Sequence, residues 1–363
     1  MIGQNAVALS RHFPISRELR LLDKLLCRQW CELPLALKKG PIRQKLSRLV
    51  AKLVGLPFSV RVAALVHPAA TDWHYSFIAE AKRTLLEERD VKAEAMLRGL
   101  EAIWSSLTSD QSSDSCFAIG TPFRIKSTGW AQRCLLEQPR DLTYDKTFQA
   151  VSQNDSEFIH DLVRASNLIE VTWPAAWEEI RRTVRYVVPF RSQGRDSFTR
   201  GRTLGAVYLS WRRGDPLWLA EMLVHEARHN RLNLLQRRTR LYRNDDELRY
   251  WSPWRQTNRP FMGILHGVYA FTGVARFHGL LIVKGHPITP LGIRRIMEES
   301  DRVVSMLRLL NRHGQWTTSG QKALEELREE AVELLDCRDH LIQHICPGYT
   351  SRSSREAALA AVT

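Results

Sequence analysis

The stretch that decides the fold is residues 215–238, DPLWLAEMLVHEARHNRLNLLQRR. Asp215 can accept hydrogen bonds from the first free amides of a helix, and Pro216 suits the first helical position. Apolar residues recur on most sides of the segment, which predicts a helix that is largely buried. We therefore expect the rest of the chain to be organised around this helix.

The helix contains an H-E-x-x-H motif, formed by His225, Glu226 and His229. Histidines at positions i and i+4 lie on one helix face and can bind one transition metal, and the glutamate can reach a metal-bound water or a partner outside the ligand set. The pattern also occurs by chance, so the alternative is two ordinary histidines in a core helix. Apolar residues 222–224 and a preceding strand-like run, 203–211, favour the metal site.

Composition and charge indicate a folded protein that binds acidic partners. The chain has 363 residues, of which 44% are hydrophobic and 25% charged, and its net charge is 53 − 39 = +14. Such a charge suits a nucleic acid, an anionic membrane or an acidic peptide. The basic residues are spread along the chain and no nucleic-acid motif occurs, so we favour a peptide and do not expect nucleic-acid binding.

The sequence predicts a cytoplasmic protein without a membrane span. Residues 1–10 lack the basic start of a signal peptide. The most apolar window, 261–283, contains His266, Arg276 and His278, so a buried helix is the better interpretation. Six cysteines at irregular spacing suit a reducing compartment with free thiols.

The predicted fold class is mainly α with a small β-sheet (α+β), built on a metalloprotease-like core. Residues 1–168 are expected to form a mainly helical scaffold or peptide-binding region, 169–345 the H-E-x-x-H catalytic domain, and 346–363 a flexible tail. Residues 239–259 are interpreted as a connection. The other predicted elements are helices at 15–30, 41–53, 72–88, 91–107, 157–168, 174–183, 262–281, 287–312 and 319–344, and strands at 184–190 and 203–211.

A metal on this helix needs a third ligand, for which His266 is the best candidate. It lies in an apolar helix, where an unpaired buried polar group costs about 1–3 kcal/mol. The alternative is a hydrogen-bonded core histidine, and His278 near the helix end is a weaker candidate ligand. Small residues in the same helix are expected to let another helix approach closely: Gly263, Gly267, Ala270 and Gly273.

Three motifs in a fixed order carry a resemblance to a known family. They are LVHEARH at 223–229, PWRQTNRP at 253–260 and LHGVYAFTGVARF at 265–277. Together they resemble the 2-oxoglutarate-dependent HExxH-type peptide β-hydroxylases, earlier catalogued as HExxH motif-containing putative peptide modification proteins. The resemblance covers roughly residues 174–281.

The resemblance implies an Fe(II)/2-oxoglutarate-dependent dioxygenase that hydroxylates a side-chain β-carbon in a ribosomally made precursor peptide. His225, His229 and His266 would hold the iron, although three histidines depart from the usual two-histidine, one-carboxylate set. Arginine suits the distal carboxylate of 2-oxoglutarate, which makes Arg255 and Arg259 the candidates. The alternative for both is solvated surface arginine, and Arg276 is a third possibility.

Two other functions fit parts of the sequence. Zinc on the same histidines would lower the pKa of bound water, with Glu226 as general base of a peptidase. The protein could instead bind peptides without catalysis. Hydrolysis gives no role to Arg255 and Arg259, and the intact H-E-x-x-H motif argues against lost catalysis, so the oxygenase is preferred.

A second histidine–cysteine cluster occurs near the C-terminus. Cys337, His340 and His344 fall on one helical stripe, and Cys346 follows. A metal is one interpretation, but a single stripe rarely closes a tetrahedral site. A structural role is therefore preferred.

Overall fold

The computed structural model describes residues 29–30, 41–54, 70–74, 76–77, 98, 116–117, 121–127, 130–136, 148–192, 197–287 and 289–345. Most of the helices expected at 15–30, 72–88 and 91–107, and all of the tail expected at 346–363, lie outside these ranges. The chain divides into two compact units. The first comprises residues 1–116, 126–138 and 200–206, and the second 117–125, 139–199 and 207–363.

In the first unit, the described elements are the helices α2 (Pro41–Val54) and α6 (Trp130–Leu136). The helix predicted at 41–53 is thus confirmed. Trp73 stacks on Trp30 and on Phe77, with ring centroids 5.6 and 4.9 Å apart. These aromatic contacts give the unit an apolar core.

The second unit contains most of a small mixed sheet. Its central strand β4 (Tyr186–Arg191) pairs in parallel with β2 (Arg124–Ile125) and antiparallel with β3 (Gln149–Ala150). The strand order is β1-β2-β4-β3, with β1 at Cys116–Phe117, and β5 (Ala206–Ser210) also pairs with β4. Every residue of β5 is buried, which explains its continuous apolar sequence.

Helices α7 (Ser156–Thr172) and α8 (Pro174–Thr183) pack against each other and against α9 (Pro216–Arg238), and each contacts a residue that flanks the sheet. Phe158 of α7 contacts Trp211 edge to face at 5.6 Å, just after β5. Trp177 of α8 contacts Phe123 in the same way at 5.7 Å, just before β2. Because α7 runs through positions 168 and 169, the domain division expected there falls inside a helix and stays a prediction.

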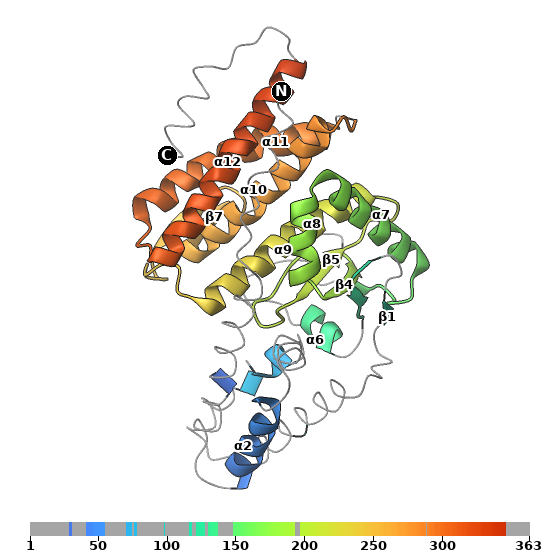
Figure 1. Ribbon diagram of the computed structural model, residues 1–363, viewed down its shortest axis with the longest axis vertical. Coiled ribbons are helices and arrows are strands. Elements are labelled where there is room, and N and C mark those ends of the chain that lie inside the picture. Colours follow the sequence, from blue (N-terminus) through green and yellow to red (C-terminus); the bar gives the residue numbers. More distant parts are fainter. Residues whose placement is uncertain are drawn as a thin grey trace. The chain divides into compact units, whose positions relative to one another are not determined.

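The rest of the second unit is helical. It comprises α9 (Pro216–Arg238), α10 (Phe261–Val283), α11 (Pro290–His313) and α12 (Thr318–Ile345). Helix α10 packs against the other three, and Figure 1 shows α10, α11 and α12 side by side. Since neighbours surround α10, most of its side chains are buried, which accounts for its apolar sequence.

Several local predictions are confirmed. The chain is mainly helical with small sheets, as the α+β prediction stated. Asp215 caps α9 by accepting a hydrogen bond from the amide of Trp218 at 2.9 Å, and Pro216 occupies the first turn. No helix within the described ranges combines the length and the apolar character that crossing a bilayer requires.

The polar and aromatic connection expected at residues 239–259 contains a strand that the sequence did not predict. This strand is β6 (Arg249–Ser252), which pairs antiparallel with β7 (Thr257–Pro260). Gln256, in the turn between them, has a φ of 51°. This hairpin leads directly into α10 and brings its turn to the predicted site.

Candidate metal centre

The two histidines of the H-E-x-x-H motif lie together on α9. Their Nε2 atoms are 3.1 Å apart, and their ring centroids are separated by 4.7 Å with the rings nearly perpendicular, at 83°. Two nitrogens that bind one ion at about 2.0–2.1 Å lie roughly 3 Å apart. Both His225 and His229 are partly exposed. The pair therefore fits a transition metal as it stands.

His266 of α10 lies on the other side of His229. Its Nδ1 atom is 3.1 Å from Nδ1 of His229, and its Nε2 atom is 3.4 Å from Oε1 of Gln236. The structure thus gathers all three histidines that the sequence singled out. They form a row in which His229 is central, rather than a ring of three donors.

This arrangement limits how the three histidines can share an ion. One imidazole gives one nitrogen to a given metal, and His229 turns Nε2 toward His225 but Nδ1 toward His266. Among the described residues, no group of three His, Cys, Asp or Glu side chains is placed to hold a metal. A three-histidine site requires rotation of the His266 or His229 ring, whereas the His225–His229 pair needs none.

The site keeps its imidazoles neutral. Burial lowers the pKa of His225 and that of His266 to about 4. Burial also places the pKa of His229 well below its ordinary value, and the two neighbouring histidines lower it further. At neutral pH all three rings therefore have a nitrogen lone pair available, which is the form that binds metals.

Glu226 is buried beside the histidine pair and held by a hydroxyl. Thr199 donates to Oε2 of Glu226 at 2.8 Å and lies 3.1 Å from the carbonyl oxygen of the same residue. Only 1% of Glu226 is exposed. A carboxylate fixed in this way can orient a group at the site. The sequence did not predict this contact, because Thr199 lies 27 residues before Glu226.

The β6–β7 turn closes one side of the site with an aromatic wall. Trp254 stacks on Phe271 with centroids 5.0 Å apart and planes 2° from parallel, and Phe271 contacts His225 edge to face at 4.9 Å. A Cβ atom on Gly267 would meet the Trp254 ring at 2.6 Å. Gly267 thus makes room for the Trp254 ring, whereas the sequence predicted the close approach of another helix.

Glu299 of α11 fixes this tryptophan. Its Oε2 atom accepts a 2.6 Å hydrogen bond from Trp254 Nε1, and its Oε1 atom accepts one from Arg302 at 2.9 Å. Glu299 is 1% exposed, and burial raises its pKa despite these partners. Glu299 lies between Ile296 and Val303 on the apolar stripe of α11. A charged residue on such a stripe was the feature of the sequence that could have indicated a buried polar contact.

The two candidate cosubstrate arginines lie differently. Arg255, in the turn, is exposed, and after burial its charge is among the causes that lower the pKa of His225 and of His229. Arg259, at the end of β7, packs along Gly263, where a Cβ atom would lie 3.1 Å from its Cβ. Of these two arginines, Arg255 is the one whose charge lowers the pKa of both histidines, after burial, and Arg295 also lowers that of His225.

The weaker candidates have other partners. Nε2 of His278 lies 2.8 Å from Oε2 of Glu221, which also pairs with Arg295. Arg276 pairs with Glu330 and Glu333 of α12. Both side chains thus have carboxylate partners of their own, and Glu221, one turn before His225, was not singled out by the sequence.

The stripe on α12 gives no sign of a second metal. Cys337 packs against α10, where a Cβ atom on Gly279 would lie 2.8 Å from its sulfur. No metal-holding group appears among the described side chains, which include His340 and His344 but not Cys346. The contact with Gly279 agrees with a packing role for Cys337.

Comparison of the chain with protein-family models and with curated proteins finds no match.

Proposed function

We propose that this protein is an Fe(II)/2-oxoglutarate-dependent oxygenase that hydroxylates a side-chain β-carbon of a ribosomally made peptide. The observation that carries the proposal is the pair His225–His229, with Nε2 atoms 3.1 Å apart. Arg255 lies in the turn whose Trp254 stacks on Phe271, which contacts His225. A metal ion held by two histidines near an arginine is suited to an anionic ligand that binds both the metal and the arginine.

The residues have distinct roles in this proposal. His225 and His229 would hold Fe(II), with His266 completing the set after its ring rotates. Arg255 would bind the distal carboxylate of 2-oxoglutarate. Glu226, held by Thr199, would orient a ligand of the site rather than take a proton.

Bound iron would supply the oxygen chemistry: 2-oxoglutarate, O2 and the peptide C–H group give succinate, CO2 and the peptide alcohol. The stacked rings of Trp254 and Phe271 would keep water from the side of His225 that they cover. The net charge of +14 suits an acidic peptide as substrate.

The test is succinate formation from 2-oxoglutarate by anaerobically purified protein loaded with Fe(II) or Zn(II). We expect oxygen-dependent turnover with iron alone, lost in His225→Ala. Arg255→Ala should raise the KM for 2-oxoglutarate, with Arg259→Ala as the matched control. Absence of turnover, together with zinc-dependent peptide cleavage that disappears in Glu226→Gln, would overturn the proposal in favour of a hydrolase.

A further inference from the structure

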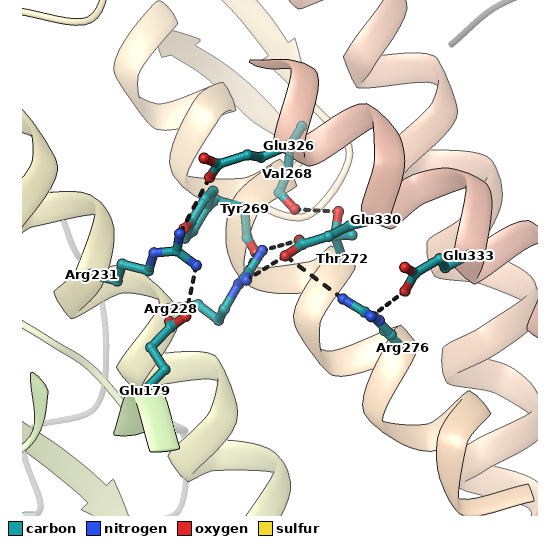
Figure 2. Close-up of polar contacts among 10 residues, drawn as sticks. All are labelled: Glu179, Arg228, Arg231, Val268, Tyr269, Thr272, Arg276, Glu326, Glu330 and Glu333. Atoms are coloured by element: carbon teal, nitrogen blue, oxygen red, sulfur yellow. Dashed lines mark hydrogen bonds and ion pairs between the residues drawn. The ribbon is translucent and has the colours of Figure 1, made fainter. Parts of the chain in front are cut away.

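Arg228 lies inside the H-E-x-x-H motif, between Glu226 and His229, yet it contacts a different part of the protein. Its Nη1 atom donates to Oε1 of Glu330 on α12 at 2.9 Å, and its Nη2 atom pairs with Oε2 of the same carboxylate. Its Nε atom donates to the carbonyl oxygen of Tyr269 on α10 at 3.1 Å. Figure 2 shows the guanidinium held between these two helices.

The packing around Arg228 restricts its side chain to one conformation. A Cβ atom on Gly273 would lie 3.0 Å from its Cγ, so glycine makes room for the side chain in α10. Its guanidinium carbon lies 4.0 Å from the centre of the Tyr269 ring. Only 5% of Arg228 is exposed. A planar fork with three of its nitrogens bonded cannot turn without breaking several contacts at once.

The charges of this pair depend on each other. Burial alone would raise the pKa of Glu330, but the adjacent Arg228 brings it below the ordinary value. Burial likewise opposes the charge of Arg228, and Glu330 outweighs it and raises the pKa of the guanidinium. The pair therefore remains ionised at neutral pH, and both members are costly to bury alone.

Neighbouring ion pairs extend the attachment of α9. Arg231, one turn later, pairs with Glu179 of α8 at 2.7 Å and with Glu326 of α12 at 3.3 Å. Arg276 of α10 lies 3.8 Å from Oε1 of Glu330 (Figure 2). The same stretch of α9 that carries the histidines is thus joined to α8 and α12 by ion pairs and to α10 by the hydrogen bond to the Tyr269 carbonyl.

We propose that Arg228 is a positioning residue, and that its clasp by Glu330 and the Tyr269 carbonyl sets the rotation of α9 about its axis. Adjacent residues of a helix are about 100° apart around that axis. Holding the Arg228 fork therefore fixes the direction in which the neighbouring His229 ring leaves the helix, and with it the spacing of the histidine pair. This inference rests on the proposed metal site.

A purely stabilising role makes a different prediction. A buried ion pair that is replaced by apolar side chains of similar volume often costs no stability. The double variant Arg228→Met/Glu330→Met should therefore fold. If the pair only stabilises, the variant will bind metal as the wild type does. If the pair positions α9, the variant will fold but bind metal poorly.

The experiment titrates the full-length apoprotein with Co(II) and records the visible spectrum, with thermal unfolding measured on the same samples. We expect about 10- to 100-fold weaker Co(II) binding and an altered spectrum in Arg228→Met/Glu330→Met, the range typical when partners of metal ligands are lost. Glu329→Gln, an exposed neighbour on α12, is the matched control and should behave as the wild type.

Wild-type affinity and spectrum in the folded double variant would overturn the inference. If the double variant does not fold, Arg228→Lys replaces it, because lysine keeps the charge but lacks the fork. We expect the same loss of affinity in Arg228→Lys, and unchanged binding there would also overturn the inference.

A failure of the proposed function can be distinguished from a failure of the positioning role of Arg228. If the wild type binds no Co(II), the proposed function fails, and the positioning role is read from the histidine ring signals of 15N-labelled, metal-free protein. The double variant should shift the signals of His225 and His229, whereas Glu329→Gln should not. Unshifted signals in the double variant would overturn the positioning role by themselves.

Discussion

Two faces of α9, one carrying His229 and the other its sequence neighbour Arg228, differ in charge, in exposure and in their partners. On one face, His225 and His229 are neutral and partly exposed, and His229 lies between His225 and a third imidazole, His266. On the other, Arg228 is buried and charged, and Glu330 accepts its bonds in a bidentate pair. The difference suggests that the charged face orients the helix so that the neutral face can bind a ligand.

The largest expected effect comes from removing the neutral face. His225→Ala and His229→Ala should each weaken Co(II) binding by at least about 100-fold, beyond the usual effect of losing a ligand's partner. Their unfolding temperatures should change little, because both rings are partly exposed. Isothermal titration with Co(II) and a thermal melt measure the two effects.

His266→Ala sharpens the same comparison. We expect a smaller loss of Co(II) affinity, because His266 faces the opposite nitrogen of His229 and must rotate before it can bind the same ion. A loss as large as that of His225→Ala would show that the three rings already act as one ligand set.

Breaking the charged face should affect stability first. Arg228→Ala leaves the buried Glu330 carboxylate without its main partner, which we expect to destabilise the protein by about 3–5 kcal/mol. Urea unfolding at pH 7 measures this change. The double variant Arg228→Met/Glu330→Met should recover most of the loss, and a double variant as unstable as Arg228→Ala would contradict an electrostatic origin.

The sequence predicted the neutral face better than the charged one, for a physical reason. The spacing of His225 and His229, and the cap at Asp215, depend only on contacts within one helix. The pairing of Arg228 with Glu330 joins residues 102 positions apart and depends on how α9 and α12 pack. Periodicity within α12 could show a stripe of glutamates, but not the cation that they would meet.

The hairpin shows a second limit of sequence reasoning. The strands at 249–252 and 257–260 have only four residues each, Pro253 directly follows the first and Pro260 ends the second, so no strand pattern stood out. Their pairing is nevertheless what carries Trp254 to Gly267 and Arg255 toward the histidines. A glycine in an apolar helix indicated a close approach correctly, but could not identify the group that approaches.

Gly267→Ala tests the contact between the hairpin and the site. The added methyl group would meet the Trp254 ring at 2.6 Å, and such overpacking usually costs about 1–3 kcal/mol. We expect the turn to shift and the KM for 2-oxoglutarate to rise. Gly279→Ala is the matched control, because it meets Cys337 at 2.6 Å in the same helix. It should lose similar stability while the KM stays constant.

The smallest expected effects distinguish two ion pairs on the charged face: the inner pair, Arg228–Glu330, and the outer pair, Arg231–Glu326. The side chains of Arg231 and Glu326 are 26% and 38% exposed, so their contact should contribute less than about 1 kcal/mol. Burial raises the pKa of Glu326 even though Arg231 lowers it, whereas the net effect on the pKa of Glu330 is a decrease. The two glutamates should therefore respond to pH in opposite directions.

The signs follow from which state holds the proton more tightly. Glu330 has a lowered folded pKa, so its contribution is present above the unfolded pKa of about 4.3 and is lost as the pH falls through the folded value. Glu326 has a raised folded pKa, so its contribution is present below about 4.3 and is lost as the pH rises through the folded value. Urea unfolding of Glu330→Gln and Glu326→Gln at several pH values from neutral to well below the unfolded pKa of about 4.3 measures both.

The penalty of Glu330→Gln should stay constant from pH 7 down to about 4.3 and shrink as the pH falls further, through the lowered folded pKa of Glu330. Glu326→Gln should be neutral or slightly stabilising at pH 7, and that small gain should disappear in acid. If both variants lost stability in parallel at pH 7, the outer pair would hold α9 as firmly as the inner one. Arg228 would then be one of several equal attachments of the charged face, and the orientation of the histidine pair would depend on the whole network rather than on one residue inside the motif.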